Sequence, residues 1–175
     1  SGGPSYMLIE TNRGNAKMIE GFQNANPEFP VANSLAYSIY KMLPNDTDLT
    51  VFREDGDIEG FNFAFIDDHF DYHTAMDIQP RLDPETLAHQ GSYLMPLLEY
   101  FSAADLDDMK SLNEEVYFNV PFFRLISYPF EWIWPMLAVG VLMFLFILAY
   151  GLKKKRLGFK GMATGLLPML IILVV

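Results

Sequence analysis

The chain has 175 residues, no cysteine and a formal net charge of −10 at pH 7. The acidity is confined to residues 1–130, which hold 7 basic and 21 acidic residues, whereas residues 131–175 hold 5 basic residues and 1 acidic residue. Because a nucleic-acid backbone requires a basic face, this acidic part argues against nucleic acid as a partner. The lack of cysteine excludes disulfides and thiolate zinc sites but leaves the cellular compartment open.

Short apolar runs alternate with helix-like patterns along residues 1–104, and this alternation favours an α/β fold over a sandwich. We expect a strand at 6–10 and helices at 14–25, 34–43 and 46–53, with Asn33 as the cap of the second helix. The run from Gly60 to Ile66 is short, apolar and bounded by turn residues, which predicts a buried strand. Because so few strands are expected, we expect residues outside this sequence to complete the sheet.

A long helix is expected after the polar loop 67–82. Asp83 suits the N-cap, Pro84 suits the first helical position, and the helix should run to Ala104. Pro96 lies inside this helix and predicts a kink. The apolar spacing predicts a core stripe that consists of Leu87, Leu94, Leu97, Leu98 and Phe101.

The remainder of the chain has the composition of a membrane anchor. Residues 105–130 are acidic and then aromatic, which is typical of a juxtamembrane linker. Residues 131–152 predict a transmembrane helix, since no charge occurs from Trp132 to Leu152 and about 20 apolar residues cross a bilayer core. A basic loop at 153–160 follows, and residues 161–175 are interpreted as a second, truncated transmembrane helix.

The basic loop predicts the topology, because short Lys/Arg-rich loops remain in the cytoplasm. Residues 1–130 would then lie in the periplasm, outside the cell or in an organelle lumen, with the lipid bilayer as a partner. Nuclear targeting is the other interpretation of this cluster, and its two apolar flanks disfavour it. The sequence starts without Met and ends inside an apolar run, so we expect an internal fragment of a longer protein.

The loop 67–82 holds two of the three histidines, and Tyr72-His73-Thr74 is its sharpest signal. Loops at the carboxyl ends of strands carry ligand sites in open α/β sheets, and imidazole is the commonest metal ligand. His69 and His73 have a helical metal spacing, but the acidic residues around them favour a turn, so His69 is interpreted as an exposed loop residue. On spacing alone, His73 is either a metal ligand or a solvated side chain.

Four motifs occur in a fixed order, at 44–52 (PNDTDLTVF), 60–66 (GFNFAFI), 72–77 (YHTAMD) and 86–91 (TLAHQG). Together they resemble the C-terminal half of the zinc-dependent aminopeptidase-fold exopeptidases, the family of bacterial leucine aminopeptidase and glutamate carboxypeptidase. The resemblance covers roughly residues 1–104 and is greatest to the membrane-bound endoplasmic-reticulum and vacuolar metallopeptidases and their bacterial relatives. The implied fold is the C-terminal half of a mixed-sheet α/β peptidase domain, followed by transmembrane helices.

The resemblance implies a peptide-hydrolysing site with two zinc ions, which activate a shared water. By motif, His73 corresponds to the last metal ligand and Tyr72 to a position that hydrogen-bonds the developing oxyanion. Asp77 would help to order the loop. Asp46, and less directly Asp48, correspond to the acid that begins a helix beside the site and supports it.

The same resemblance places the remaining motifs, a His-x-Asp, a Glu-Glu pair and a further ligand, before Ser1. One of five ligands is then present and the general base is absent, so we expect residues 1–175 alone to be inactive and to bind no zinc tightly. The family default is a peptide substrate, whereas specificity and oligomeric state are left open.

Three alternatives remain at this point. The domain is a receptor or binding ectodomain that has lost its metals, a single-zinc transferase similar to glutaminyl cyclase, or a structural membrane protein with an acidic ectodomain. An intact Tyr72-His73-Thr74 favours the enzyme over the binding ectodomain, and the two expected spans disfavour the transferase. A structural protein does not explain the series of motifs.

Overall fold

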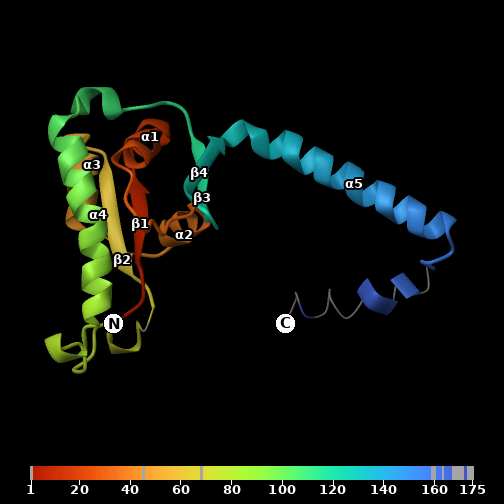
Figure 1. Cartoon of the computed structure of the whole chain (residues 1–175), viewed down its shortest axis with the longest axis horizontal. Helices are drawn as coiled ribbons and strands as arrows, with labels where there is room; N and C mark the ends of the chain where they lie inside the picture. The colour runs from red at the N-terminus through yellow and green to blue at the C-terminus, as the bar shows by residue number, and fades with distance from the viewer. Residues whose placement is uncertain are drawn as a thin grey trace. The chain divides into compact units, whose positions relative to one another are not determined.

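A computed structural model describes residues 2–44, 46–67, 69–158, 161–162, 164–166 and 172. The chain divides into two compact units, Ser1–Phe130 and Glu131–Val175, which are described separately (Figure 1). Most of the expected second span at 161–175 lies outside the described residues.

The first unit is organised around an antiparallel pair of strands, β1 (Ser5–Glu10) and β2 (Gly60–Phe65). Both strands were predicted from their apolar runs. The register pairs Ser5 with Phe65 at one end and Glu10 with Gly60 at the other. The expected burial of β2 is wrong: it is half-buried along its length, because no described strand pairs with its second edge.

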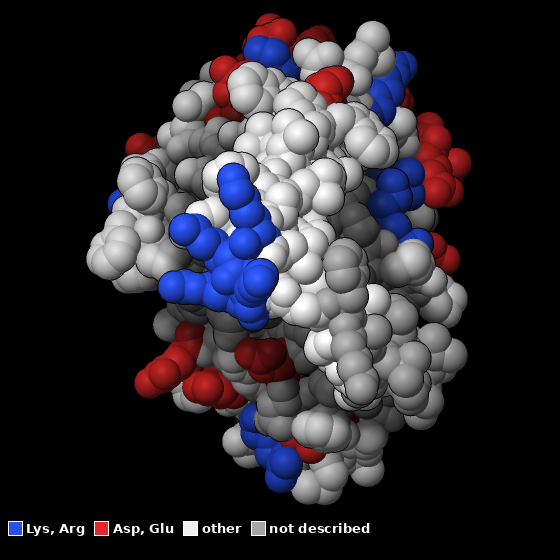
Figure 2. All heavy atoms as spheres, turned by 90° about the vertical axis from the view of Figure 1, so that its right-hand side faces the viewer, with Lys and Arg blue, Asp and Glu red and all other residues white. Residues whose placement is uncertain are grey.

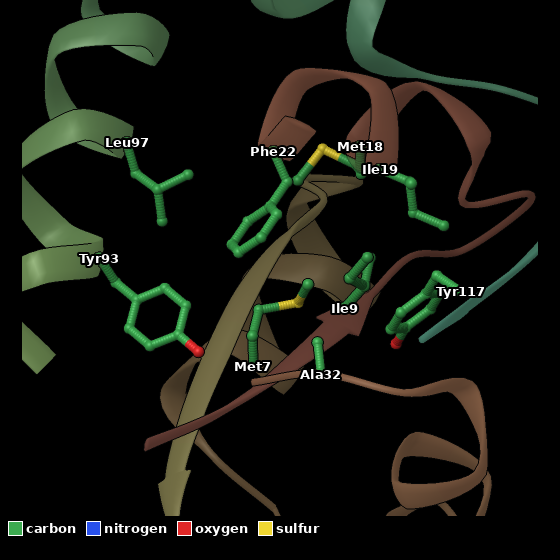
Figure 3. Close-up of a cluster of buried hydrophobic side chains, with 9 residues drawn as sticks. All are labelled: Met7, Ile9, Met18, Ile19, Phe22, Ala32, Tyr93, Leu97 and Tyr117. Atoms are coloured by element: carbon green, nitrogen blue, oxygen red, sulfur yellow. The ribbon is translucent and has the colours of Figure 1, made fainter. Parts of the chain in front are cut away.

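One face of this pair carries the core together with α1 (Ala16–Ala25) and α4 (Pro84–Ala103). Figure 3 shows Tyr93 and Leu97 of α4 lying opposite side chains of α1 and β1. On β2, the Phe61 ring contacts Phe22 at a centroid distance of 5.6 Å and the Phe63 ring contacts Tyr93 at 5.3 Å. The core cluster consists of Met7, Ile9, Met18, Ile19, Phe22, Ala32, Tyr93, Leu97 and Tyr117.

Helix α4 begins as its sequence predicts, since the Asp83 carboxylate accepts from the backbone N–H of Glu85 at 2.9 Å. It continues through Pro96 to Ala103. The predicted core stripe is only partly right: Leu97 is buried and Phe101 packs against the core, but the other three members are exposed, namely Leu87, Leu94 and Leu98. The buried residues of α4 are Thr86, Tyr93 and Leu97, so the buried face shares Leu97 with the expected stripe and is rotated from it toward Thr86 and Tyr93.

Helices α2 (Ser34–Tyr40) and α3 (Asp48–Gly56) hold no buried residue. Asn33 caps α2 as expected, because its side chain accepts from the Ala36 N–H at 2.7 Å. The cap of α3 is Thr47, one of the three residues at 46–48 expected to cap it, and its N–H donates to the Thr50 hydroxyl at 3.2 Å. The helix also extends past the expected end at Arg53.

The interpretation of residues 105–130 as a linker is wrong for most of that segment. A 3₁₀ turn, η3 (Leu106–Met109), leads into a hairpin formed by β3 (Glu115–Val120) and β4 (Phe123–Pro129). Tyr117 on β3 is 1% exposed and joins the core cluster beside Ile9 (Figure 3). The hairpin therefore belongs to the first unit.

The second unit contains α5 (Ile133–Lys153), an apolar helix. Residues 130–153 are long and apolar enough to cross a membrane, with a mean hydropathy of 2.3 and none of the apolar window buried. Four consecutive basic residues, Lys153 to Arg156, lie at the C-terminal end of this helix. Figure 2 shows a group of Lys and Arg side chains gathered in one patch. These features are compatible with a membrane-spanning helix.

Candidate functional site

The loop after β2 is held at the Ser5–Phe65 end of the strand pair, where the start of the chain and the start of α4 also lie. The Gly2 N–H donates to the Asp67 carbonyl at 3.4 Å, and the Thr86 hydroxyl donates to the Gly3 carbonyl at 2.8 Å. Gly3 has a φ of +79°, and a Cβ at this position would overlap the Asp67 side chain. Glycine is therefore required for this close approach.

An ion pair between Asp71 and Arg81 closes the loop. Asp71 lies in η1 (His69–Asp71) and Arg81 in η2 (Gln79–Arg81). The guanidinium donates two hydrogen bonds, Nε to Oδ2 at 2.7 Å and an Nη to Oδ1 at 3.1 Å. Asp71 is 7% exposed, and the hydrogen bond from Arg81 holds the pKa of its carboxyl below the usual value. Such a bidentate pair restrains orientation as well as distance.

His73 lies in a turn that Asp71 closes, because the Thr74 N–H and hydroxyl both donate to the Asp71 carbonyl, at 3.0 and 2.7 Å. The backbone of His73 has a φ of 58°, which is uncommon for a residue other than glycine. Its imidazole stacks on the Tyr72 ring at a centroid distance of 4.0 Å. Both side chains are exposed, and no described residue hydrogen-bonds a ring nitrogen of His73. The turn thus presents an imidazole whose nitrogens have no hydrogen-bond partner in the described part of the chain.

The other two histidines differ from each other. His89 on α4 uses both ring nitrogens: Nδ1 accepts from the Ser5 N–H at 3.1 Å, so Nε2 carries the proton and donates to the Phe29 carbonyl at 2.9 Å. His89 is therefore a structural bridge within the fold. His69 is exposed, as predicted, and stacks on Phe70 at 4.7 Å.

The expected supporting acids do not gather around His73. Asp77 lies on the same loop and is exposed, and its N–H donates to the Thr74 carbonyl at 3.2 Å. Asp46 and Asp48 lie near the other end of the strand pair, at the start of α3. Asp46 lines a pocket of ≈ 270 Å³ together with Glu10, which pairs with Gly60.

That opposite end holds a buried carboxylate that sequence reasoning missed. Glu10 is 4% exposed, and its carboxylate lies 3.5 Å from Arg53 Nε and accepts from the Tyr40 hydroxyl at 3.4 Å. Burial and the Glu10 charge raise the pKa of Tyr37 to about 12. The position of Glu10 at the end of an apolar strand was a sequence signal that could have indicated its burial. No such signal distinguished Asp71, because it is one of several acidic residues in the loop.

The described residues do not form a metal site by themselves. Among them, no group of three or more His, Asp or Glu side chains is placed to hold a metal ion. His73 can supply one bond through a ring nitrogen, whereas zinc sites in proteins use three or four protein ligands. A bound metal would need further ligands beside those in the described part of the chain.

Comparison with known proteins matches residues 1–98 to the model of peptidase family M28. Endoplasmic reticulum metallopeptidase 1 of Rattus norvegicus is 26% identical over 132 residues, covering 73% of this chain and 15% of that protein. Its Homo sapiens counterpart is 25% identical over 132 residues, or 73% of this chain and 14% of that protein. Putative endoplasmic reticulum metallopeptidase 1 of Schizosaccharomyces pombe is 32% identical over 95 residues, or 52% of this chain and 11% of that protein.

The chain thus spans between about one ninth and one seventh of the length of these curated relatives. No solved structure matches it significantly.

Proposed function

The chain belongs to peptidase family M28, and from this premise we propose that it forms part of a membrane-anchored, zinc-dependent exopeptidase of the aminopeptidase type. The family match covers the strand pair, the His73 loop and most of α4. The substrate is a peptide, and the reaction is hydrolysis at its terminus.

The observation that carries this proposal is the exposed imidazole of His73. The His73 side chain is exposed, no described residue hydrogen-bonds its ring nitrogens, and the Asp71–Arg81 ion pair restrains the loop that bears it. A ligand histidine must keep one nitrogen available, and a fixed loop lowers the cost of ordering it on binding. Tyr72, stacked beside it, would offer its hydroxyl to the oxygen that gains charge during hydrolysis.

His73 would be one ligand of a centre with two zinc ions, and zinc supplies an activated water when bound. The other ligands and the general base would come from outside the described residues. Asp46 and Asp48 would then act at a distance, because they lie at the other end of the strand pair. The isolated chain should therefore show no peptidase activity.

We further propose that α5 crosses a membrane. Its length, its apolar composition and the basic residues after it support this anchor. The loop 153–160 would be cytoplasmic, and residues 1–130 would face a non-cytoplasmic compartment. The names of the relatives favour the lumen of the endoplasmic reticulum.

A peptide-hydrolysis assay tests this function. The protein is purified in detergent from the cells that produce it, both with the original sequence and as the His73→Ala variant. Each version is then assayed with aminoacyl-fluorophore substrates. His69→Ala is the matched control, because His69 is an exposed imidazole in the same loop. We expect His73→Ala to reduce kcat/KM at least 100-fold and His69→Ala to leave it within threefold.

Equal activity of the two variants would contradict the role of His73. A cell-produced protein without any hydrolysis would favour a binding ectodomain of this fold. A zinc titration of residues 1–175 should give no stoichiometric nanomolar site, and finding one would contradict the need for outside ligands.

A further inference from the structure

The β3–β4 hairpin has two different faces. On the inner face, Tyr117 is buried in the core and is paired with Ser127. On the outer face, Val116 pairs with Tyr128 and Phe118 pairs with Ile126. The rings of Phe118 and Tyr128 are in contact at 6.3 Å, which confirms that these side chains share one face. All four are partly exposed, and none carries a charge.

The turn of the hairpin presents aromatic side chains to the outside. Phe122 is 103% exposed and Phe123 is 67% exposed. Phe122 has a φ of 70°, in the left-handed region that glycine or asparagine adopts most easily. A phenylalanine here gains no burial within its own domain and costs about 1 kcal/mol or more of backbone strain. Because no burial within the domain compensates this backbone strain, we infer that Phe122 makes a contact outside the domain.

Chain connectivity limits where that contact can be. Strand β4 ends at Pro129, and the candidate membrane span begins at Phe130. Phe122 and Phe130 are eight positions apart, so the turn lies within roughly 28 Å of the start of the span even if the chain between them is fully extended. A bilayer that holds α5 is therefore within reach of the whole hairpin.

We propose that the outer face of this hairpin rests on the surface of the bilayer that α5 enters, with Phe122 and Phe123 inserted at headgroup level. Aromatic side chains favour this interfacial region. Arg124, next to Ile126 on the outer face of β4, donates to the Asn26 and Pro27 carbonyls within the domain. The uncharged pairs of the outer face and the acidic residues elsewhere in 1–130 favour an uncharged or zwitterionic lipid surface over an anionic one. The contact would hold the domain in one orientation relative to the membrane.

This inference rests on the membrane half of the proposed function and is independent of peptidase activity. The chain has no cysteine, so single cysteines can be introduced and labelled with the environment-sensitive dye NBD. We choose Phe122→Cys at the turn, Asp55→Cys on exposed α3 as a control outside the hairpin, and Val141→Cys within α5. The labelled full chains are reconstituted into phosphatidylcholine vesicles that contain lipids with a nitroxide quencher at a shallow or a deep position.

We expect the shallow quencher to reduce emission at position 122 at least twofold more than at position 55, and the deep quencher to act most strongly at position 141. The contact at 122 should need no anionic lipid and should persist in 0.5 M salt. Emission at 122 that matches position 55 while position 141 is quenched would overturn the hairpin contact and leave the anchor intact. An unquenched position 141 would overturn the anchor and the contact together, without touching the peptidase proposal.

Discussion

Replacing Tyr117 by alanine tests whether the hairpin is an integral part of the domain. Tyr117 is 1% exposed and packs in the cluster with Ile9 and Met7 (Figure 3). Truncation of a fully buried aromatic side chain removes its apolar burial and leaves a cavity, which costs about 3–5 kcal/mol. A domain of this size has a total stability of about 5–15 kcal/mol, so Tyr117→Ala should remove a large part of it.

The assay is urea unfolding of the full chain in a mild non-ionic detergent, followed by the near-ultraviolet circular dichroism of the tyrosines. Tyr128→Ala is the matched control, because this tyrosine lies on the outer face of the same hairpin and is only partly buried. We expect the control to cost under about 1.5 kcal/mol, since outer-face pairs in a sheet contribute about 0.2–1 kcal/mol. Equal effects of the two substitutions would refute the packing described for the hairpin.

Three further predictions concern the loop, the core and a helix cap. Asp71→Asn weakens the ion pair to Arg81 and should raise amide exchange throughout the loop. Because the pKa of Asp71 is lowered, the order it provides is complete above the usual Asp value of about 3.9 and is lost as pH falls through the lowered pKa, which NMR follows. Tyr93→Phe leaves the Val31 N–H without its partner and should lower the free energy of unfolding by about 1–3 kcal/mol. Asn33→Ala removes the cap of α2 and should cost about 1 kcal/mol in the same measurement.

Local signals predicted the elements well where the deciding residues are neighbours in sequence. Asn33 and Asp83 cap their helices by contacts two or three residues away, and both were identified from the residue type. The side of α4 that is buried was less predictable. Leu94 and Tyr93 are both apolar enough for a core, and only the position of β2 decides that Tyr93 faces inward.

The hairpin was missed because its turn lacks the usual signal. Two-residue hairpin turns need a positive φ and usually contain glycine or asparagine. This one contains Pro121 and Phe122, and phenylalanine adopts the positive φ. An aromatic-rich segment beside an apolar helix was therefore interpreted as a linker.

The role of His73 stays a prediction, and the sequence led to this one residue rather than to a set of neighbouring site residues. The motif led to His73, and the structure presents its imidazole exposed. The Asp71–Arg81 pair that fixes the loop joins residues ten positions apart, and several neighbouring acids were equally plausible partners for the arginine. Asp46 was expected to support His73, but the antiparallel register puts the two at opposite ends of the strand pair.

Locating a zinc ion bound to His73 would test the proposed metal site most directly. A structure of the cell-produced protein, with diffraction recorded on both sides of the zinc absorption edge, locates zinc independently of the protein density. We expect a zinc ion about 2.0–2.1 Å from a ring nitrogen of His73. Zinc bound elsewhere, with the His73 imidazole still in solvent, would contradict this proposal.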